Sequence, residues 1–140
     1  MKRIASLANG SSKDRLRVNI QRCISTFGRH ETDKQLDPRA PTAVVPAIEQ
    51  PTKTPRAGPD TGSSEVQIGI LTAKIRTLAD FLATRGKMDK VNKRNLRLLV
   101  HRRQKLLAYL RRKERGGPRW THCIETLGLT EGTWKGEITL

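Results

Sequence analysis

The function that the residue types of this chain indicate most strongly is the binding of phosphate. Residues 85–119 carry 14 Lys or Arg against only Asp89 and Glu114. Charge of a single sign on an ordered element raises a strong field, and the polyanion that such a field most often meets is nucleic acid. We therefore predict a nucleic-acid partner. The alternatives are a basic helix face kept for solubility and a helix drawn to an acidic membrane surface.

The other reactive side chains do not form a recognisable catalytic or metal site. Cys23 and Cys123 stand a hundred positions apart, so neither a disulfide framework nor a metal knuckle is indicated. His122 adjoins Cys123, but neighbouring helical residues point about 100° apart. His30 and His101 lack a nearby nucleophile or carboxylate at a catalytic spacing. We predict no enzymatic activity, cofactor, metal or small-molecule substrate.

Apolar residues at helical spacing predict the elements that hold the basic side chains. One stripe gives a helix to about Thr84, ended by Gly86, and a second gives a helix to about Arg115, ended by Gly116. The two helices are long enough to pack side by side as an antiparallel hairpin. Aromatic residues make up 4% of the 140-residue chain and no apolar run approaches a bilayer span, which favours a small all-α bundle without a membrane segment. The two stripes are Val66, Ile70, Leu71, Ile75, Leu78, Leu82 and Leu96, Leu99, Val100, Leu106, Leu107, Leu110.

Short signals mark where the helices begin and end. Ser63 or Ser64 suits the cap of the first helix, and Ser64 with Gln67 fits a capping box. A short third helix is expected between Pro118 and Gly128, and it should fold back over the hairpin. In the tail, residues 130–140, Trp134 is either a satellite core residue or a contact for a neighbouring subunit.

The region before the hairpin divides by composition. Residues 1–30 are basic and rich in serine, as in an organellar transit peptide, although a retained arm that touches RNA is the alternative. Ile20, Ile24 and Phe27 allow a short amphipathic helix there. Residues 31–59 hold six of the seven prolines, which predicts an extended linker. The ordered domain is then expected over residues 60–129, preceded by an extended N-terminal arm.

Several motifs closely resemble the small-subunit ribosomal protein fifteen family. They are DTGSSEVQ at 60–67, LTAKI at 71–75, LLVHRRQKLLAYLRR at 98–112 and IETLGL at 124–129, in the family's order and spacing. The stretch KERGGPRW at 113–120 looks like the mitochondrial, fungal-type branch. The resemblance covers about half the chain and implies a helical protein that binds small-subunit ribosomal RNA (rRNA) at a three-way junction and a nearby minor groove. One departure from the family is expected upstream, where proline-rich sequence replaces the family's first short helix.

The resemblance also assigns site residues. It places junction contacts at the start of the first long helix and near the end of the second, which an antiparallel hairpin brings together. The minor-groove contact uses a His, an Asp and a Ser in the turn; here Asp89 is the Asp, Asn92 stands for the Ser, and the His is missing. The junction residues are Thr61, Gly62, Ser63, Gln67, Tyr109 and Arg112, and the basic residues expected to read phosphate and shape are Lys90, Lys93, Arg94, Arg97 and Arg102.

Together these features predict a structural component of the mitochondrial small ribosomal subunit in the matrix. Its partners would be small-subunit rRNA and neighbouring ribosomal proteins. A free RNA-binding regulator, or a general basic nucleic-acid-binding protein, is the alternative. A membrane-surface amphipathic protein is a third possibility.

Overall fold

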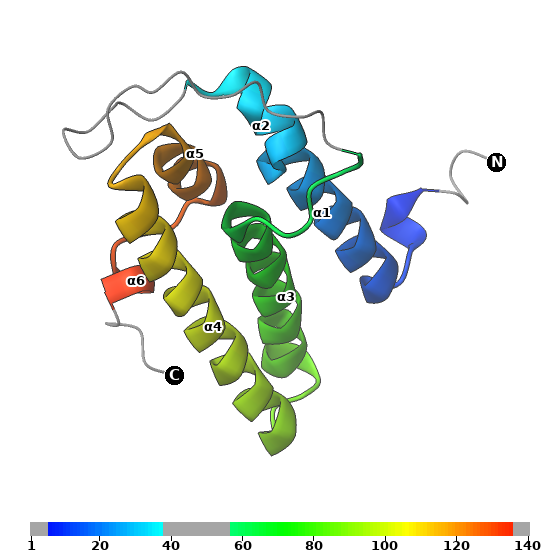
Figure 1. Cartoon of the computed structure of the whole chain (residues 1–140). Coiled ribbons are helices and arrows are strands. Elements are labelled where there is room, and N and C mark those ends of the chain that lie inside the picture. Colours follow the sequence, from blue (N-terminus) through cyan, green and yellow to red (C-terminus); the bar gives the residue numbers. More distant parts are fainter. Residues whose placement is uncertain (1–5, 38–56, 136–140) are drawn as a thin grey trace.

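The computed structural model describes residues 6–37 and 57–135, and within these ranges it contains helices and no strand. A 3-10 turn, η1 (Leu7–Asn9), precedes two helices, α1 (Ser12–Phe27) and α2 (Arg29–Gln35). After the proline-rich segment come α3 (Ser64–Thr84), α4 (Lys90–Glu114), α5 (Pro118–Leu127) and α6 (Gly132–Lys135). Figure 1 shows the helices in one cluster, with α3 between α1 and α4. The all-α prediction is confirmed.

The long hairpin forms as its apolar stripes predicted. α3 and α4 lie side by side, and Leu107, Leu110 and Ile68 between them are fully buried. Gly86 follows α3 and is buried beneath the Phe81 ring; a Cβ at this glycine would lie 2.6 Å from Phe81 Cε1. The turn therefore ends α3 by packing a ring against a residue with no side chain.

The C-terminal helices complete the core on one side of the hairpin. α5 begins with Pro118 and ends at Gly128, whose φ of 61° is the left-handed conformation expected of a helix-ending glycine. Cys123 is fully buried, and burial raises the pKa of its thiol to about 12, so it is a core residue and not a nucleophile. Trp134 packs edge-on against Trp120 with ring centroids 5.1 Å apart, which makes it a satellite core residue.

The extended N-terminal arm is not what the structure shows. α1 is capped by Ser11 and Asp14 in a reciprocal capping box and packs along α3, which confirms the short amphipathic helix suggested by Ile20, Ile24 and Phe27. Phe27 is buried between α3 and α5: a Cβ on Gly69 would lie 2.9 Å from its ring, and the ring meets His122 edge-on at 5.7 Å. The bundle therefore has an upstream helix, α1, that packs on α3 ahead of the proline-rich sequence.

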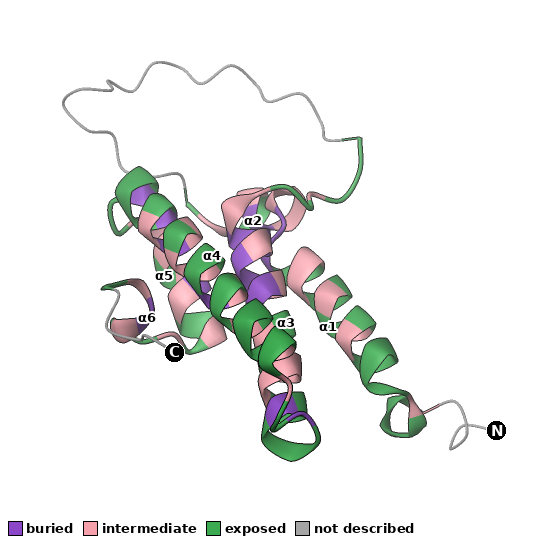
Figure 2. Cartoon of the chain, turned by 90° about the horizontal axis from the view of Figure 1, so that it is seen from below, coloured by how far each residue is buried: buried purple, intermediate pink, exposed green. Residues whose placement is uncertain are grey.

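α2 also lies in a region expected to be linker. Its ties to the rest of the bundle are polar: Arg119 on α5 donates to Thr32 Oγ1 at 3.1 Å and pairs with Asp33. α2 ends at Gln35, with Leu36 as its C-cap, and the described chain resumes at residue 57 ahead of α3. Residues 38–56 lie outside the described ranges, so the linker there stays a prediction. Figure 2 shows the buried residues concentrated where α3 and α4 face their neighbours, with the first turns of α1 exposed.

Candidate nucleic-acid interface

The loop before α3 is organised by one carboxylate. Asp60 Oδ1 accepts hydrogen bonds from the backbone N–H of Gly62 at 3.0 Å and Ser63 at 3.2 Å. Asp60 Oδ2 accepts from the N–H of Arg29, 31 residues earlier, at 3.2 Å. Burial raises the pKa of Asp60, but these backbone donors outweigh it and hold that pKa below the usual value. The loop is thereby fixed to the junction of α1 and α2.

The predicted capping box is wrong. Ser63 is the N-cap of α3 but its side chain makes no capping bond, and Ser64 Oγ donates instead to Glu65. Gln67 reaches back to the other side of the cap, with Nε2 donating to the Gly62 carbonyl at 3.4 Å. Asp60 has already satisfied the free amides of Gly62 and Ser63, so the loop is held by Asp60 at its start and Gln67 at its end.

A hollow of about 400 Å³ lies between this loop and the last turns of α4. Tyr109 stands on one wall with 47% of its surface exposed, and the Nζ of Lys113 lies 5.6 Å from the centre of its ring. The hollow thus offers a flat aromatic ring, a side-chain amide and a positive charge, which are groups that recognise a base face, a 2′-OH and a phosphate. Its lining residues are Arg29, Asp60, Gly62, Ser63, Ser64, Gln67, Leu106, Tyr109 and Lys113.

The hollow brings together most of the predicted junction residues. Gly62, Ser63, Gln67 and Tyr109 line it, as an antiparallel hairpin required. Thr61 is exposed in the same loop and Arg112 is exposed one turn after Tyr109, but neither lines the hollow.

Five lining residues were not predicted as RNA contacts, and two of them, Arg29 and Lys113, are basic. Lys113 could have been found, because it stands four residues after Tyr109 and so shares its helix face. Arg29 could not, because the contact that brings it here spans the proline-rich segment.

The opposite end of the hairpin presents the second predicted set. Asp89 caps α4: its Oδ1 accepts from the N–H of Asn92 at 2.9 Å and its Oδ2 accepts from the Asn92 side chain at 2.6 Å. The bonds from Asn92 lower the pKa of Asp89, so the carboxylate stays charged. The cap accounts for the positions of both side chains without any RNA, and their role as minor-groove contacts stays a prediction. The basic residues Lys90, Lys93, Arg94, Arg97 and Arg102 are all exposed along α4.

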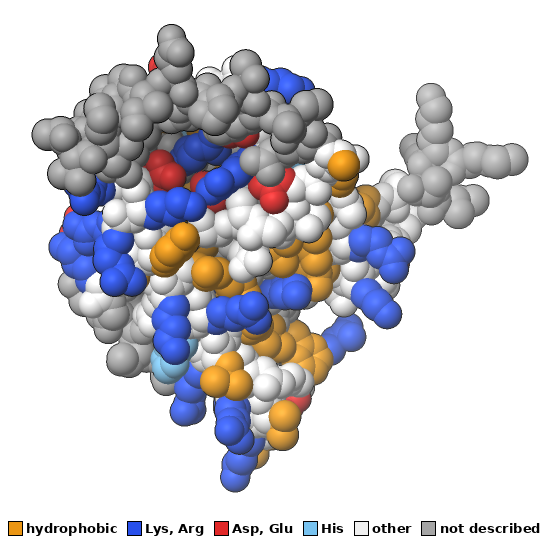
Figure 3. Space-filling model, viewed as in Figure 1, with side chains coloured by type: hydrophobic (Ala, Val, Ile, Leu, Met, Phe, Trp, Pro, Cys, Tyr) orange, Lys and Arg blue, Asp and Glu red, His pale blue; other side chains and the backbone are white. Residues whose placement is uncertain are grey.

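Charge on the visible face is unevenly distributed. In Figure 3 the Lys and Arg side chains run along most of the molecule, whereas most acidic side chains in view gather near α2 and the start of α3. Within the described ranges no three His, Cys, Asp or Glu side chains cluster as metal ligands would. None of the helices described is both long and apolar enough to span a bilayer.

Comparison with known proteins agrees with these motifs. The family model for ribosomal protein S15 matches residues 48–130, more than half of the chain, including the 60–63 loop, the hairpin and α5. The chain belongs to the ribosomal protein S15 family. The match begins after α1 and α2, so the two N-terminal helices lie outside the part that defines this S15 family.

Individual S15 relatives extend the comparison. The small ribosomal subunit protein uS15m of Neurospora crassa is 57% identical over 141 residues, covering 100% of this chain and 44% of that protein. The protein of the same name from Schizosaccharomyces pombe is 33% identical over 137 residues, covering 98% of this chain and 37% of that protein. A bacterial uS15, from Alkalilimnicola ehrlichii, is 46% identical over 77 residues, covering 55% of this chain and 83% of the bacterial protein. The chain therefore spans less than half the length of these two fungal relatives, and both alignments take in α1 and α2.

Proposed function

We propose that this S15-family protein is a structural component of the mitochondrial small ribosomal subunit, where it binds small-subunit rRNA and adjoins other ribosomal proteins. Family membership and the names of the two fungal relatives support the assignment. The observation that carries the RNA-binding role is the hollow between the 60–63 loop and Tyr109, with a strongly basic helix as its wall. The role needs no catalysis.

The hollow is the proposed junction contact. Gly62 has no side chain and nothing but Asp60 within 4 Å of its Cβ position, so an RNA backbone could approach the loop closely. Gln67 and Tyr109 supply hydrogen bonding and a ring face, and Lys113 adds charge. Thr61 and Arg112 flank the hollow and would contact the strands that enter it.

The turn end is the proposed second contact. Asp89 and Asn92 form a compact polar group that would contact a minor groove. The exposed side chains of Lys90, Lys93, Arg94 and Arg97 would contact the phosphates on either side of that groove. Arg102 would continue the phosphate contacts along α4. Because the two sets lie at opposite ends of the hairpin, the protein would fix the angle between two RNA helices.

The membrane-surface alternative is disfavoured by burial. A helix that lies on a bilayer needs a free apolar face, but the stripes of α3 and α4 are packed against each other and against α5, with Leu107 and Leu110 fully buried.

Sedimentation of mitochondrial lysate tests the assignment directly. An integral component should co-sediment with the small subunit through moderate salt, whereas a free RNA-binding regulator should remain near the top of the gradient. In the same assay Arg112→Ala should weaken incorporation more than Arg111→Ala, although the two residues carry the same charge. Equal losses would instead indicate a general basic patch.

A further inference from the structure

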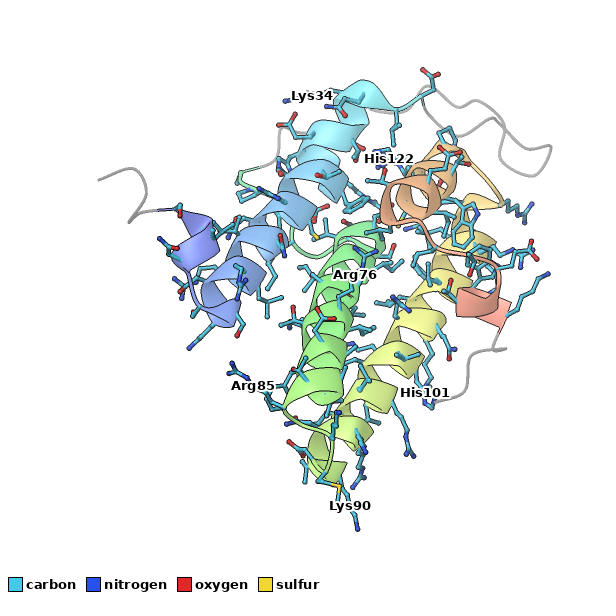
Figure 4. All side chains as sticks on the ribbon, turned by 180° about the vertical axis from the view of Figure 1, so that it is seen from behind. Lys34, Arg76, Arg85, Lys90, His101 and His122 are labelled. Carbon is cyan, nitrogen blue, oxygen red and sulfur yellow. The ribbon has the colours of Figure 1, made fainter. Side chains whose placement is uncertain are left out.

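Arg76 and Arg103 form a basic pair on the side of the hairpin away from the hollow. Gln67, which lines the hollow, and Arg76 are nine residues apart on α3, and nine steps of about 100° place them on opposite helix faces. Arg76 Nη2 donates to the carbonyl of Leu127, at the end of α5, at 3.3 Å. Figure 4, seen from behind, shows Arg76 on α3 near α5.

The second arginine is held between the two long helices. Arg103 Nη1 donates to Thr72 Oγ1 on α3 at 3.3 Å, and its Nε is buried without a hydrogen-bond partner in the described part of the chain. Burial lowers the pKa of Arg103, and the neighbouring charge of Arg76 lowers it further. Two positive charges therefore lie near each other, and one of them, on Arg103, is already partly desolvated by burial.

Arg76 is exposed and Arg103 is partly buried, and the charge of Arg103 is not neutralised as the charges of two other partly buried arginines are. Arg29 pairs with Glu65 at 3.4 Å, and Arg119 pairs with Asp33. Over residues 6–37 and 57–135, neither Arg76 nor Arg103 forms an ion pair with any carboxylate. The two guanidiniums are therefore arranged to receive an anion from outside the described chain.

We propose that Arg76 and Arg103 bind a backbone phosphate of rRNA, giving this protein a third RNA contact, on the side of the hairpin away from the hollow. A phosphodiester has two non-bridging oxygens, so each guanidinium can take one, whereas a single protein carboxylate would usually satisfy one arginine fork. The surplus of basic residues through 85–119 also favours a polyanion over an isolated acidic side chain. The inference rests on the proposed rRNA-binding function and adds a further RNA-binding surface to the protein.

Arginine Nε–H resonances of the full chain test the site itself. Titration with inorganic phosphate at constant ionic strength should move the Arg103 Nε–H signal saturably. The matched control is Arg111, which is exposed on α4 and whose signal should move little. An Arg103 signal that moves no more than that of Arg111 would overturn the site, and this measurement needs no variant and no RNA.

RNA binding then identifies the source of the phosphate. Arg76→Gln should weaken binding to complete small-subunit rRNA about tenfold, and Arg103→Lys, which keeps the charge but loses the fork, should weaken it less. Both variants should bind an isolated three-way-junction fragment within about twofold of the wild type, and Arg111→Gln should leave binding to both RNAs nearly unchanged.

The remaining outcomes of these two experiments each contradict a specific part of the account. Equal losses on the two RNAs would overturn the proposal, because the arginines would then act through the fold of the hairpin. A phosphate-induced shift with unchanged rRNA affinity would also overturn it and indicate a protein carboxylate as the partner. If the wild-type chain bound neither RNA, the proposed function itself would fail, while the phosphate titration would still report on the pair.

Discussion

The two ends of the α3–α4 hairpin both carry polar groups suited to RNA, but they are built in different ways. At the hollow, Asp60 joins the loop to Arg29, 31 residues away, and Phe27 holds α1 and α2 in place behind it. At the turn, Asp89 and Asn92 bond to each other across three residues, and Met88 and Val91 beside them are 91% and 70% exposed. One end is fixed by tertiary packing and the other by a local helix cap, so the two should respond differently to change.

The largest difference is expected from the two phenylalanines. Phe27→Ala removes a buried ring between α3 and α5 and should cost about 3–5 kcal/mol of unfolding free energy. Phe81→Ala, near the turn, removes a ring that is 41% exposed and should cost clearly less. Urea unfolding of both variants measures this. A similar loss for both would mean that the hollow end is no more dependent on packing than the turn.

A smaller difference is expected from the two loop carboxylates. In Asp60→Asn the amide group keeps one acceptor oxygen for Gly62 and Ser63 but cannot accept from Arg29 N–H, so the loop should loosen at a cost of about 1–2 kcal/mol. Asp89→Asn retains the cap oxygen for the Asn92 N–H and loses only the acceptor for the Asn92 side-chain amide, whereas Asp60→Asn loses the acceptor for a backbone N–H; Asp89→Asn should therefore cost less. Chemical denaturation at neutral pH compares them, and a costlier Asp89→Asn would reverse the ranking of the two ends.

The contribution of Asp60 should also depend on pH. Because the folded state lowers its pKa, the stabilisation is complete above the unfolded-state value near 4 and is lost as pH falls through the lower folded-state value. The gap in unfolding free energy between wild type and Asp60→Asn should therefore close below about pH 4. A gap that stayed constant down to about pH 2 would show that the charge of Asp60 is not what holds the loop.

Prediction from sequence succeeded where the determinants are local. The hairpin follows from apolar residues three and four apart, and the ends of α5 follow from Pro118 and Gly128. The packing of α1 on α3 could not be predicted in this way, because the two helices are separated in sequence by the proline-rich segment. Prolines break helices, but they do not prevent the elements on either side of them from packing together.

The same distinction between local and long-range determinants applies to the candidate site. Gly62, Gln67 and Tyr109 were reached through the resemblance and the antiparallel geometry, and the structure brings them together. The capping box was wrong because α3 begins one residue earlier than that pattern requires: Ser63 is the N-cap, and the N–H of Gln67 donates to the Ser63 carbonyl. The position of Arg29 at the hollow could not be predicted, because it depends on a hydrogen bond to a residue 31 positions away.

The smallest effect is expected from shortening the proline-rich segment. The segment leaves after α2 and returns at Asp60, next to Arg29, so its ends are held by the fold. Replacing residues 38–56 with about ten Gly and Ser residues should change the unfolding free energy by less than about 1 kcal/mol, since loop entropy varies slowly with length. Thermal unfolding of the shortened chain measures it; a large loss would show that the segment contributes packing to the hollow end.

Binding of Tyr109→Ala to two RNAs tests the central claim most directly. If the hollow is a specific junction site, the variant should lose about 1–3 kcal/mol on a small-subunit three-way junction and much less on plain duplex. Leu98→Ala, which truncates a side chain 56% exposed elsewhere on α4, should change binding little on either RNA. Equal losses for Tyr109→Ala on junction and duplex would contradict the account, because the hollow would then contribute only non-specific affinity.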